Sequence, residues 1–257
     1  MNKVMSLEEI CGIIRPADGK IMDEVWKRWD NKCIPLRSLG WLQESLVRIA
    51  GVQGSIRPEI DRKLTFVMAA DNGVVDEGVS QSDYHVTTQV VENMMHHKAT
   101  IMLMSEQADS DVLVVDMGMK EKVEGVLDMS LMRGTANMAE GPAMRRETAV
   151  KAIEAGAFLA MRKAGEGYRL FATGEMGIEN TTSSSAVLAV LSGEPVSVVT
   201  GRGAGLSGEG LERKIKTVEK AIHVNKPDPS DPLDVLSKVG GLDIACLLYT
   251  SDAADDS

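Results

Sequence analysis

The stretch GEMGIENTTSSS, residues 174–185, combines two glycines, one asparagine and five hydroxyl side chains. It stands between an apolar run and the sequence AVLAVL, which predicts a strand, a loop and the start of a helix. Backbone N–H groups and the helix dipole favour an anion at such a helix start. Because ordinary capping needs only one or two of these residues, we interpret this loop as an anion-binding site. Glu175 and Glu179 place two negative charges beside it.

A lysine is a second candidate for the same site. Lys214 falls about two turns into the helix that we expect after GRGAGLSG, residues 201–208. It reaches the anion only if this helix lies next to the one that starts near residue 181. For a lone lysine, an ordinary solvated surface position is the interpretation that we favour from these residues alone.

The segment GRGAGLSG also contains a literal G-x-G-x-x-G at Gly203, Gly205 and Gly208. A dinucleotide site would need an acidic residue at the end of a strand roughly 20 residues further on. That distance falls in KPDPSDP, residues 226–232, a proline-rich loop with no preceding strand. We therefore favour a tight turn that only glycine permits.

Another run, DVLVVDMG (111–118), resembles the strand with terminal acids that binds pyrophosphoryl-ribose and magnesium. Such sites present paired acids, whereas Asp116 is followed by Met117. An aspartate that caps a turn at a strand end is the simpler interpretation. We expect no metal here.

Four apolar runs end in polar loops and predict parallel strands at 64–73, 111–118, 168–177 and 195–205. Helical patterns alternate with them, at residues 86–108, 146–165, 181–193 and 207–225. This order predicts an α/β fold with a parallel sheet and helices on its faces. Ligands bind outside the carboxyl ends of such strands. We therefore expect one crevice lined by Asp71, Glu175, Thr200 and Gly201.

The composition excludes several classes of protein. The formal net charge is −10, which argues against a nucleic-acid partner because a polyanion requires basic surface. No run approaches the roughly 18 apolar residues of a membrane helix. Three widely spaced cysteines predict reduced thiols. We expect a cytoplasmic protein with neither a membrane nor a nucleic-acid partner.

Five long segments together resemble the nicotinate-nucleotide dimethylbenzimidazole phosphoribosyltransferase family, in order and at similar spacing. They are residues 69–87, 133–144, 174–193, 200–215 and 225–245. The resemblance implies a Rossmann-like domain over residues 61–245 with helices on both faces of its sheet. It also implies a small helical domain drawn from both chain ends, to which residues 1–60 contribute, and a homodimer with active sites near the interface.

The resemblance further implies a reaction. The 5-phosphoribosyl group of nicotinate mononucleotide passes to 5,6-dimethylbenzimidazole or a related lower-ligand base. The products are α-ribazole 5′-phosphate and nicotinate, in cobalamin nucleotide-loop assembly. The azole nitrogen attacks C1′ with inversion, so orientation of two rings about one carbon supplies much of the catalysis. No metal and no other cofactor is implied.

Site residues carry over by position. The phosphate-binding loop of the family falls on Gly177, Ile178, Glu179, Asn180, Thr181 and Thr182, its phosphate-pairing lysine falls on Lys214, and Gly203 joins the substrate-binding set. Glu175 matches a glutamate that orients the incoming base, and the Ser82 hydroxyl lines the azole pocket. Two positions depart from the family: QSDY lacks the usual proline, and Glu179 stands where members place Gly or Ala.

The end of the chain departs further. CLLYTSDAADDS, residues 246–257, resembles the translation of a transposase adapter used to prepare sequencing libraries, so we expect a non-native tail and a natural sequence that continues differently after Ala245. The general base of the family, a glutamate in an RxGEG-like segment, has no counterpart before that point. We therefore expect this chain not to turn over by itself.

Two other classes of function remain open. A module that binds a nucleotide phosphate without chemistry fits the loop and the missing base. A purely structural α/β fragment fits the interrupted C-terminus. Release of nicotinate that depends on a benzimidazole separates the enzyme from both alternatives.

Overall fold

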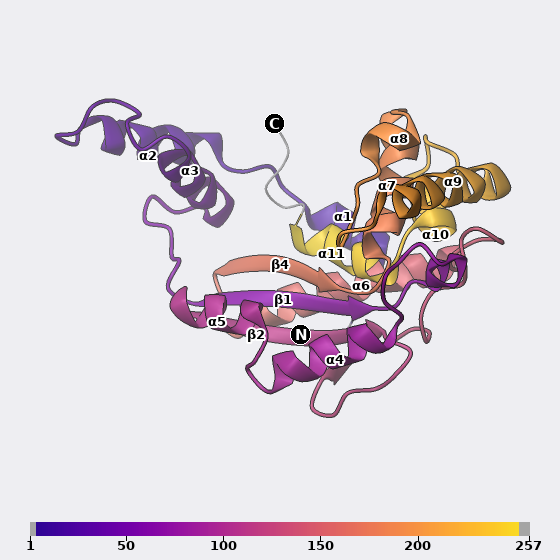
Figure 1. Cartoon of the computed structure of the whole chain (residues 1–257). Helices are drawn as coiled ribbons and strands as arrows, with labels where there is room; N and C mark the ends of the chain where they lie inside the picture. Colours follow the sequence, from indigo (N-terminus) through magenta and orange to yellow (C-terminus); the bar gives the residue numbers. More distant parts are fainter. Residues whose placement is uncertain (1–3, 252–257) are drawn as a thin grey trace.

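A parallel four-stranded sheet forms the centre of the chain (Figure 1). The structure, a computed structural model, describes residues 4–251. The strands β1 (Lys63–Ala70), β2 (Ser110–Gly118), β3 (Leu127–Asp128) and β4 (Leu170–Met176) lie in the order β3-β2-β1-β4. The first three predicted strands are thus confirmed, whereas the short edge strand β3 was not expected.

Side chains of β1 alternate between two apolar layers. Phe66 and Met68 pack in a core with helices α6 (Arg146–Gly165) and α11 (Leu242–Ser251). Val67 and Ala69 face the opposite layer, which α4 (His85–Met95) and α5 (Thr100–Gln107) cover. The two-residue period of a strand explains this alternation. Helices therefore cover both faces of the sheet, as predicted (Figure 1).

The prediction of one continuous helix over residues 86–108 is wrong, because this segment forms two helices. Two helices, α4 and α5, meet at His97, which adopts a left-handed backbone conformation with φ of 55°. A left-handed residue ends a right-handed helix because the regular hydrogen-bond ladder stops there. The apolar period continues on both sides of the break, so periodicity alone did not reveal it.

The fourth predicted strand, at 195–205, is also wrong. Its valines form the short helix α8 (Val196–Val199), with Pro195 at the N-cap. Val198 is 70% exposed, so the run does not pack as a buried strand. Short apolar runs are ambiguous between strand and helix, and the β preference of valine depends on packing against neighbouring strands.

A second apolar cluster joins α7 (Asn180–Ser192), α9 (Gly208–Asn225) and α10 (Pro232–Val239). Ala186 from α7, Val218 from α9 and Val235 from α10 are each at most 1% exposed in it. The short helix η1 (Gly73–Glu77), which follows β1, contributes Val74. This packing brings α7 and α9 side by side, which is the arrangement that Lys214 requires.

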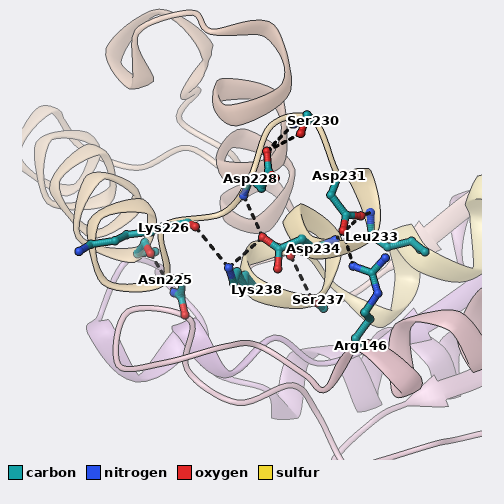
Figure 2. A network of polar contacts seen from close by, with 11 residues as sticks. Arg146, Asn225, Lys226, Asp228, Ser230, Asp231, Leu233, Asp234, Ser237 and Lys238 are labelled. Carbon is teal, nitrogen blue, oxygen red and sulfur yellow. Dashed lines mark hydrogen bonds and ion pairs between the residues drawn. The ribbon is translucent and has the colours of Figure 1, made fainter.

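Polar contacts hold α10 in place (Figure 2). Asp231 caps the helix by accepting from the backbone N–H groups of Leu233 and Asp234, and its carboxylate lies 2.7 Å from Arg146 at the start of α6. Asp234 accepts from the Asp228 backbone N–H, and pairs with Lys238 at 2.8 Å. The KPDPSDP loop is therefore tied to α6 and α10 by hydrogen bonds and ion pairs.

The N-terminal segment contains α1 (Leu7–Ile13), α2 (Gly19–Asp30) and α3 (Trp41–Gln53). Helix α1 lies against the main body, where the Leu7 backbone N–H donates to Glu154 on α6 at 2.9 Å. Helices α2 and α3 pack on one another through Val25 and Val47 and extend away from the sheet (Figure 1). At the other end, α11 continues past Ala245 and buries Cys246, and residues 252–257 of the predicted tail lie outside the described residues.

Candidate phosphate-binding site

The loop between β4 and α7 lies directly against the end of β1. A Cβ atom added to Gly177 would stand 1.9 Å from the Ala70 carbonyl oxygen. Only glycine permits this approach between two backbone segments. The close contact sets the position of the first turn of α7 relative to the sheet.

Replacing Gly177 by alanine is therefore expected to destabilise the protein by about 3 kcal/mol, the upper range for overpacking a filled site. Gly174→Ala is the matched control, because the added Cβ there meets the Phe66 carbonyl oxygen at an ordinary 3.5 Å. Urea unfolding of both variants measures the difference. Equal stability of the two would show that the loop shifts without cost.

A small pocket of about 80 Å³ opens at this loop. Its lining includes Gly177 to Thr181, Gly203 and Lys214. The Lys214 side chain is 1% exposed, and its Nζ donates to Thr181 Oγ1 at 2.6 Å. Seven of the sequence-predicted residues are thus together, and the solvated-surface interpretation of Lys214 is wrong.

Lys214 retains hydrogen-bonding capacity in the pocket. An ammonium group has three N–H donors, and within the described part of the chain only Thr181 Oγ1 accepts one of them. Burial lowers the pKa of Lys214, and the nearby Glu179 carboxylate opposes that shift. An anion that enters the pocket would therefore complete the bonding of the lysine.

The backbone N–H groups of the loop differ from our expectation. Several free N–H groups were predicted, but four of them donate within the protein. The acceptors are Thr87 Oγ1 for Ile178, the Gly177 carbonyl oxygen for Asn180, Asn180 Oδ1 for Thr181 and the Glu179 carbonyl oxygen for Thr182. Among residues 178–182, the Glu179 N–H has no acceptor within the described residues. Within this loop, the Glu179 N–H and the helix dipole thus remain available to an anion, beside Lys214.

Glu179 occupies the N-cap of α7 in a left-handed conformation, with φ of 69°. This conformation costs a non-glycine residue about 1 kcal/mol. Glycine would adopt it without this cost, which is a physical reason for the glycine that the resemblance places at this position. Its carboxylate accepts a hydrogen bond from the Thr182 hydroxyl and is 7% exposed. Thr182 itself lies behind the pocket, in the buried side of α7.

Glu175 lies at the end of β4 and is linked to the loop by Asn180, whose amide donates to its carboxylate. Part of the Glu175 side chain is exposed, yet surrounding atoms still remove water from its carboxylate. This burial raises the pKa of Glu175, and the Asn180 hydrogen bond opposes the rise. A carboxylate beside the loop is therefore held in a fixed position.

Two residues that the sequence did not single out tie the loop to its surroundings. Asn72 Oδ1 accepts from Ser183 Oγ at 2.9 Å, and Asn72 is 1% exposed. Thr87 on α4 is fully buried and holds the Ile178 N–H at 3.1 Å. Both belong to the segment 69–87 that resembles the family, but their long-range contacts leave no periodic signal.

A third such residue, Asp243, lies in the first turn of α11. Its side chain is fully buried, and its Oδ2 has no hydrogen-bond partner in the described structure. Burial, followed by the charge of Glu175, raises the pKa of Asp243 to about 7, whereas the hydrogen bond from the Ile244 backbone N–H and then the Asn72 side chain oppose the rise. The charge of Glu175 at the end of β4 thus helps to keep the buried Asp243 carboxyl group protonated.

The remaining predicted residues lie around this centre. Ser82 is next to Gln81, which lines the pocket, but is not itself in the lining. Asp71 is 1% exposed, with its Oδ2 accepting from the Lys120 backbone N–H at 2.8 Å. Thr200 is buried and Gly201 exposed, after a helix rather than a strand. The loops at 71–73 and 174–182 adjoin as expected. The predicted crevice at the ends of four strands is wrong in one respect, because Thr200 and Gly201 follow helix α8 instead of a fourth strand.

Two motif interpretations are confirmed. Asp116 caps a turn by accepting from the Met119 N–H at 2.7 Å, and it also pairs with Arg133 at 2.7 Å. Gly203 and Gly205 have φ of 53° and 98°, which is the tight glycine turn that we favoured over a dinucleotide fingerprint.

Residues 4–251 contain neither a cluster of metal-ligating side chains nor a membrane-spanning helix. No group of three or more His, Cys, Asp or Glu side chains there is arranged to hold a metal ion. No helix in that range has both the length and the apolar character needed to cross a bilayer. The absence of a metal from the reaction stays a prediction.

Known proteins similar to this chain agree with one another. Residues 14–252 match a protein-family profile described as "Phosphoribosyltransferase". The nicotinate-nucleotide–dimethylbenzimidazole phosphoribosyltransferase of Geobacter metallireducens is 46% identical over 93% of this chain and 69% of its own length. The protein of the same name from Clostridium tetani is 43% identical over 93% of this chain and 67% of its own length.

A solved structure shows the same relationship in three dimensions. The crystal structure of CobT from Thermus thermophilus superposes with a TM-score of 0.83 at 40% identity, covering 89% of this chain and 69% of that one. The family profile, the sequence relatives and the solved structure thus all indicate the same family. This chain belongs to the nicotinate-nucleotide dimethylbenzimidazole phosphoribosyltransferase family of enzymes.

Proposed function

We propose that the chain binds nicotinate mononucleotide with its phosphate in the pocket at the start of α7. The proposal also includes transfer of its 5-phosphoribosyl group to 5,6-dimethylbenzimidazole or a related base. The products are α-ribazole 5′-phosphate and nicotinate. The relatives named for this reaction are 46% and 43% identical to this chain, each over 93% of its length.

One observation carries the proposal: a buried lysine with unused donors faces a helix N-terminus across a small pocket. The pocket is much smaller than the several hundred Å³ that enclose a whole drug-sized ligand. It therefore suits a terminal anionic group and leaves the rings of the nucleotide outside it. A phosphate attached to a ribose has this form.

In the proposed reaction, a nitrogen of the benzimidazole donates its electron pair to C1′ of the ribose. The bond from C1′ to the nicotinate nitrogen breaks, and that nitrogen keeps the bonding pair, so neutral pyridine is restored in the leaving nicotinate. The other azole nitrogen then loses its proton to a base. Holding the phosphate fixes C1′ relative to both rings, and such positioning lowers the barrier.

Glu175 is the residue that we propose for orienting the incoming base. The Asn180 hydrogen bond fixes its carboxylate beside the phosphate loop, and a carboxylate accepts a hydrogen bond from an azole N–H. Ser82, next to the pocket, is proposed to contact the same ring. We propose that the general base lies outside these residues, since this chain spans only 69% of the length of the Geobacter metallireducens relative.

The test compares this chain with a chimaera that carries the C-terminal segment of the Geobacter metallireducens relative. We expect the chimaera to form α-ribazole 5′-phosphate only when dimethylbenzimidazole is present. A base within hydrogen-bond reach contributes on the order of a hundred-fold or more, so the chain alone should bind the nucleotide with little or no turnover. Chromatography of the products measures both.

Two outcomes would change this proposal. A chimaera that binds nicotinate mononucleotide but never releases nicotinate would favour the non-catalytic binding module. Equal turnover by the two proteins would place the base within this chain, with Glu175 as the first residue to replace.

We also propose the homodimer that the family resemblance implies. Large apolar side chains are exposed around α3, including Trp41 at 77% and Leu36 at 71%. Burying such surface against a second copy is favourable. Light scattering is expected to give twice the mass of one chain, and a monomer at high concentration would contradict this.

A further inference from the structure

The charges that line the phosphate pocket are unusual for an anion site. Within the described part of the chain, its charged lining residues are Glu179, Arg202 and Lys214. Burial lowers the pKa of Lys214, and the charge of the nearby Glu179 carboxylate partly offsets that shift. The formal charges of this pair cancel, so Lys214 alone gives the pocket no net positive charge.

A phosphate monoester carries close to two negative charges at neutral pH. The N-terminus of α7 offers about half a positive charge. Glu179 is 7% exposed and its carboxylate is held by Thr182, so it does not simply turn into solvent. Another cation at the pocket is therefore needed to favour a dianion.

Arg202 has the position for this role. The next residue, Gly203, lies so close to the site that an added Cβ would be 3.0 Å from Thr181 Oγ1 and 3.3 Å from Lys214 Nζ. The Gln81 side chain ties the same loop to the other side of the pocket by donating to the Gly205 carbonyl oxygen at 2.8 Å. Arg202 thus extends from a loop that is fixed directly over the buried lysine.

Arg202 also has donors to spare. Its Nη1 donates to the Leu206 carbonyl oxygen at 2.7 Å, within its own loop. A guanidinium has five N–H donors in a planar fork that matches phosphate oxygens. No carboxylate of the described residues forms an ion pair with it. The loop contact holds the side chain at the pocket without neutralising its charge.

We propose that Arg202 is a phosphate-binding residue and supplies the positive charge that Glu179 offsets at Lys214. This inference rests on the proposed function of the same pocket. In this proposal Arg202 contacts the phosphate. A second cation is required because Glu179 offsets the charge of Lys214.

The experiment is a double-mutant cycle with Arg202→Ala and Glu179→Gly, measured by calorimetric titration of nicotinate mononucleotide. Arg202→Ala is expected to weaken binding about tenfold, the lower range for a hydrogen bond to a charged group. Glu179→Gly alone leaves affinity unchanged or improves it, because glycine suits the left-handed backbone there. In the Glu179→Gly background, Arg202→Ala should cost about threefold or less, since the effects of two groups that line one pocket and act on one ligand are not additive.

Two controls make the result specific. Lys216→Ala removes the same charge from an exposed position on α9 and should leave affinity unchanged. Nicotinate riboside, which lacks the phosphate, should bind the wild type and Arg202→Ala equally. A tenfold loss for the riboside as well would assign Arg202 to the nicotinate carboxylate and overturn the inference, as would equal losses in both backgrounds of the cycle.

The outcome also separates this inference from the proposed function. If Lys214→Ala weakens nucleotide binding while Arg202→Ala does not, the inference about Arg202 fails and the pocket stands. If neither substitution affects binding of nicotinate mononucleotide, the proposed phosphate site fails with it.

Discussion

Replacing Asp243 by asparagine is expected to remove a large pH dependence of stability. The pKa of Asp243 is raised from 3.8 to about 7 by burial and by Glu175. The folded state therefore keeps a proton that the unfolded chain loses between these two values. Because the native state binds more protons in that interval, its stability falls as the pH rises.

Each pH unit across the interval corresponds to about 1.4 kcal/mol. Relative to Asp243→Asn, the unfolding free energy of the wild type should fall by about 4 kcal/mol from near pH 4 to near pH 8. Urea unfolding at several pH values measures this. The control is Asp23→Asn on the exposed side of α2, which should follow the wild-type curve. Parallel curves for the wild type and Asp243→Asn would contradict the predicted protonation.

Replacing Lys214 by alanine is expected to weaken binding of nicotinate mononucleotide by roughly 1.5 to 3 kcal/mol, the range for a hydrogen bond to a charged group. Nicotinate itself lacks the phosphate and should be little affected. Isothermal titration with both ligands separates the two effects. Equal losses for both would place Lys214 at the ring rather than at the phosphate.

The buried position of Lys214 calls for a packing control. The side chain is 1% exposed, so alanine leaves a cavity as well as removing a charge. Lys214→Met keeps most of the volume and should lose affinity as alanine does. Wild-type affinity in Lys214→Met would show that the alanine result came from packing.

The sequence predicted the parts of the fold that have a local period. β1 and β2 read as apolar runs because both of their faces are buried. The valines of α8 show the same composition, yet most of Val198 faces solvent. Composition cannot distinguish these cases, because tertiary packing decides between strand and helix for short runs.

The candidate site divides in a similar way. Gly177 to Thr181 could be predicted because they occupy the turn between a strand and a helix, where capping chemistry is local. Lys214 depended on whether α7 and α9 are neighbours, which the shared apolar cluster now shows. Its contact with Thr181 joins residues 33 positions apart, beyond the reach of any local pattern.

Asn72 and Asp243 were missed for a related reason. Asn72 follows Asp71 in the polar loop after β1, where such residues usually indicate a turn. Asp243 is a single polar residue within the apolar stretch GGLDIA. Their importance comes from burial and from contacts with residues far along the chain, as in the Ser183 hydroxyl that donates to Asn72. Arg202 was missed because a single arginine in a glycine-rich loop does not indicate a binding site by itself. Its role depends on Lys214 and Glu179, which only the fold brings to the same pocket.

The most direct test of the account is a crystal structure of this chain with nicotinate mononucleotide. We predict that the phosphorus atom lies between the N-terminus of α7 and Lys214 Nζ, with the ribose directed toward Glu175. Phosphate oxygens should be within hydrogen-bond distance of Lys214 and the Glu179 N–H. A nucleotide bound with its phosphate in solvent, or away from residues 177–181, would contradict the account.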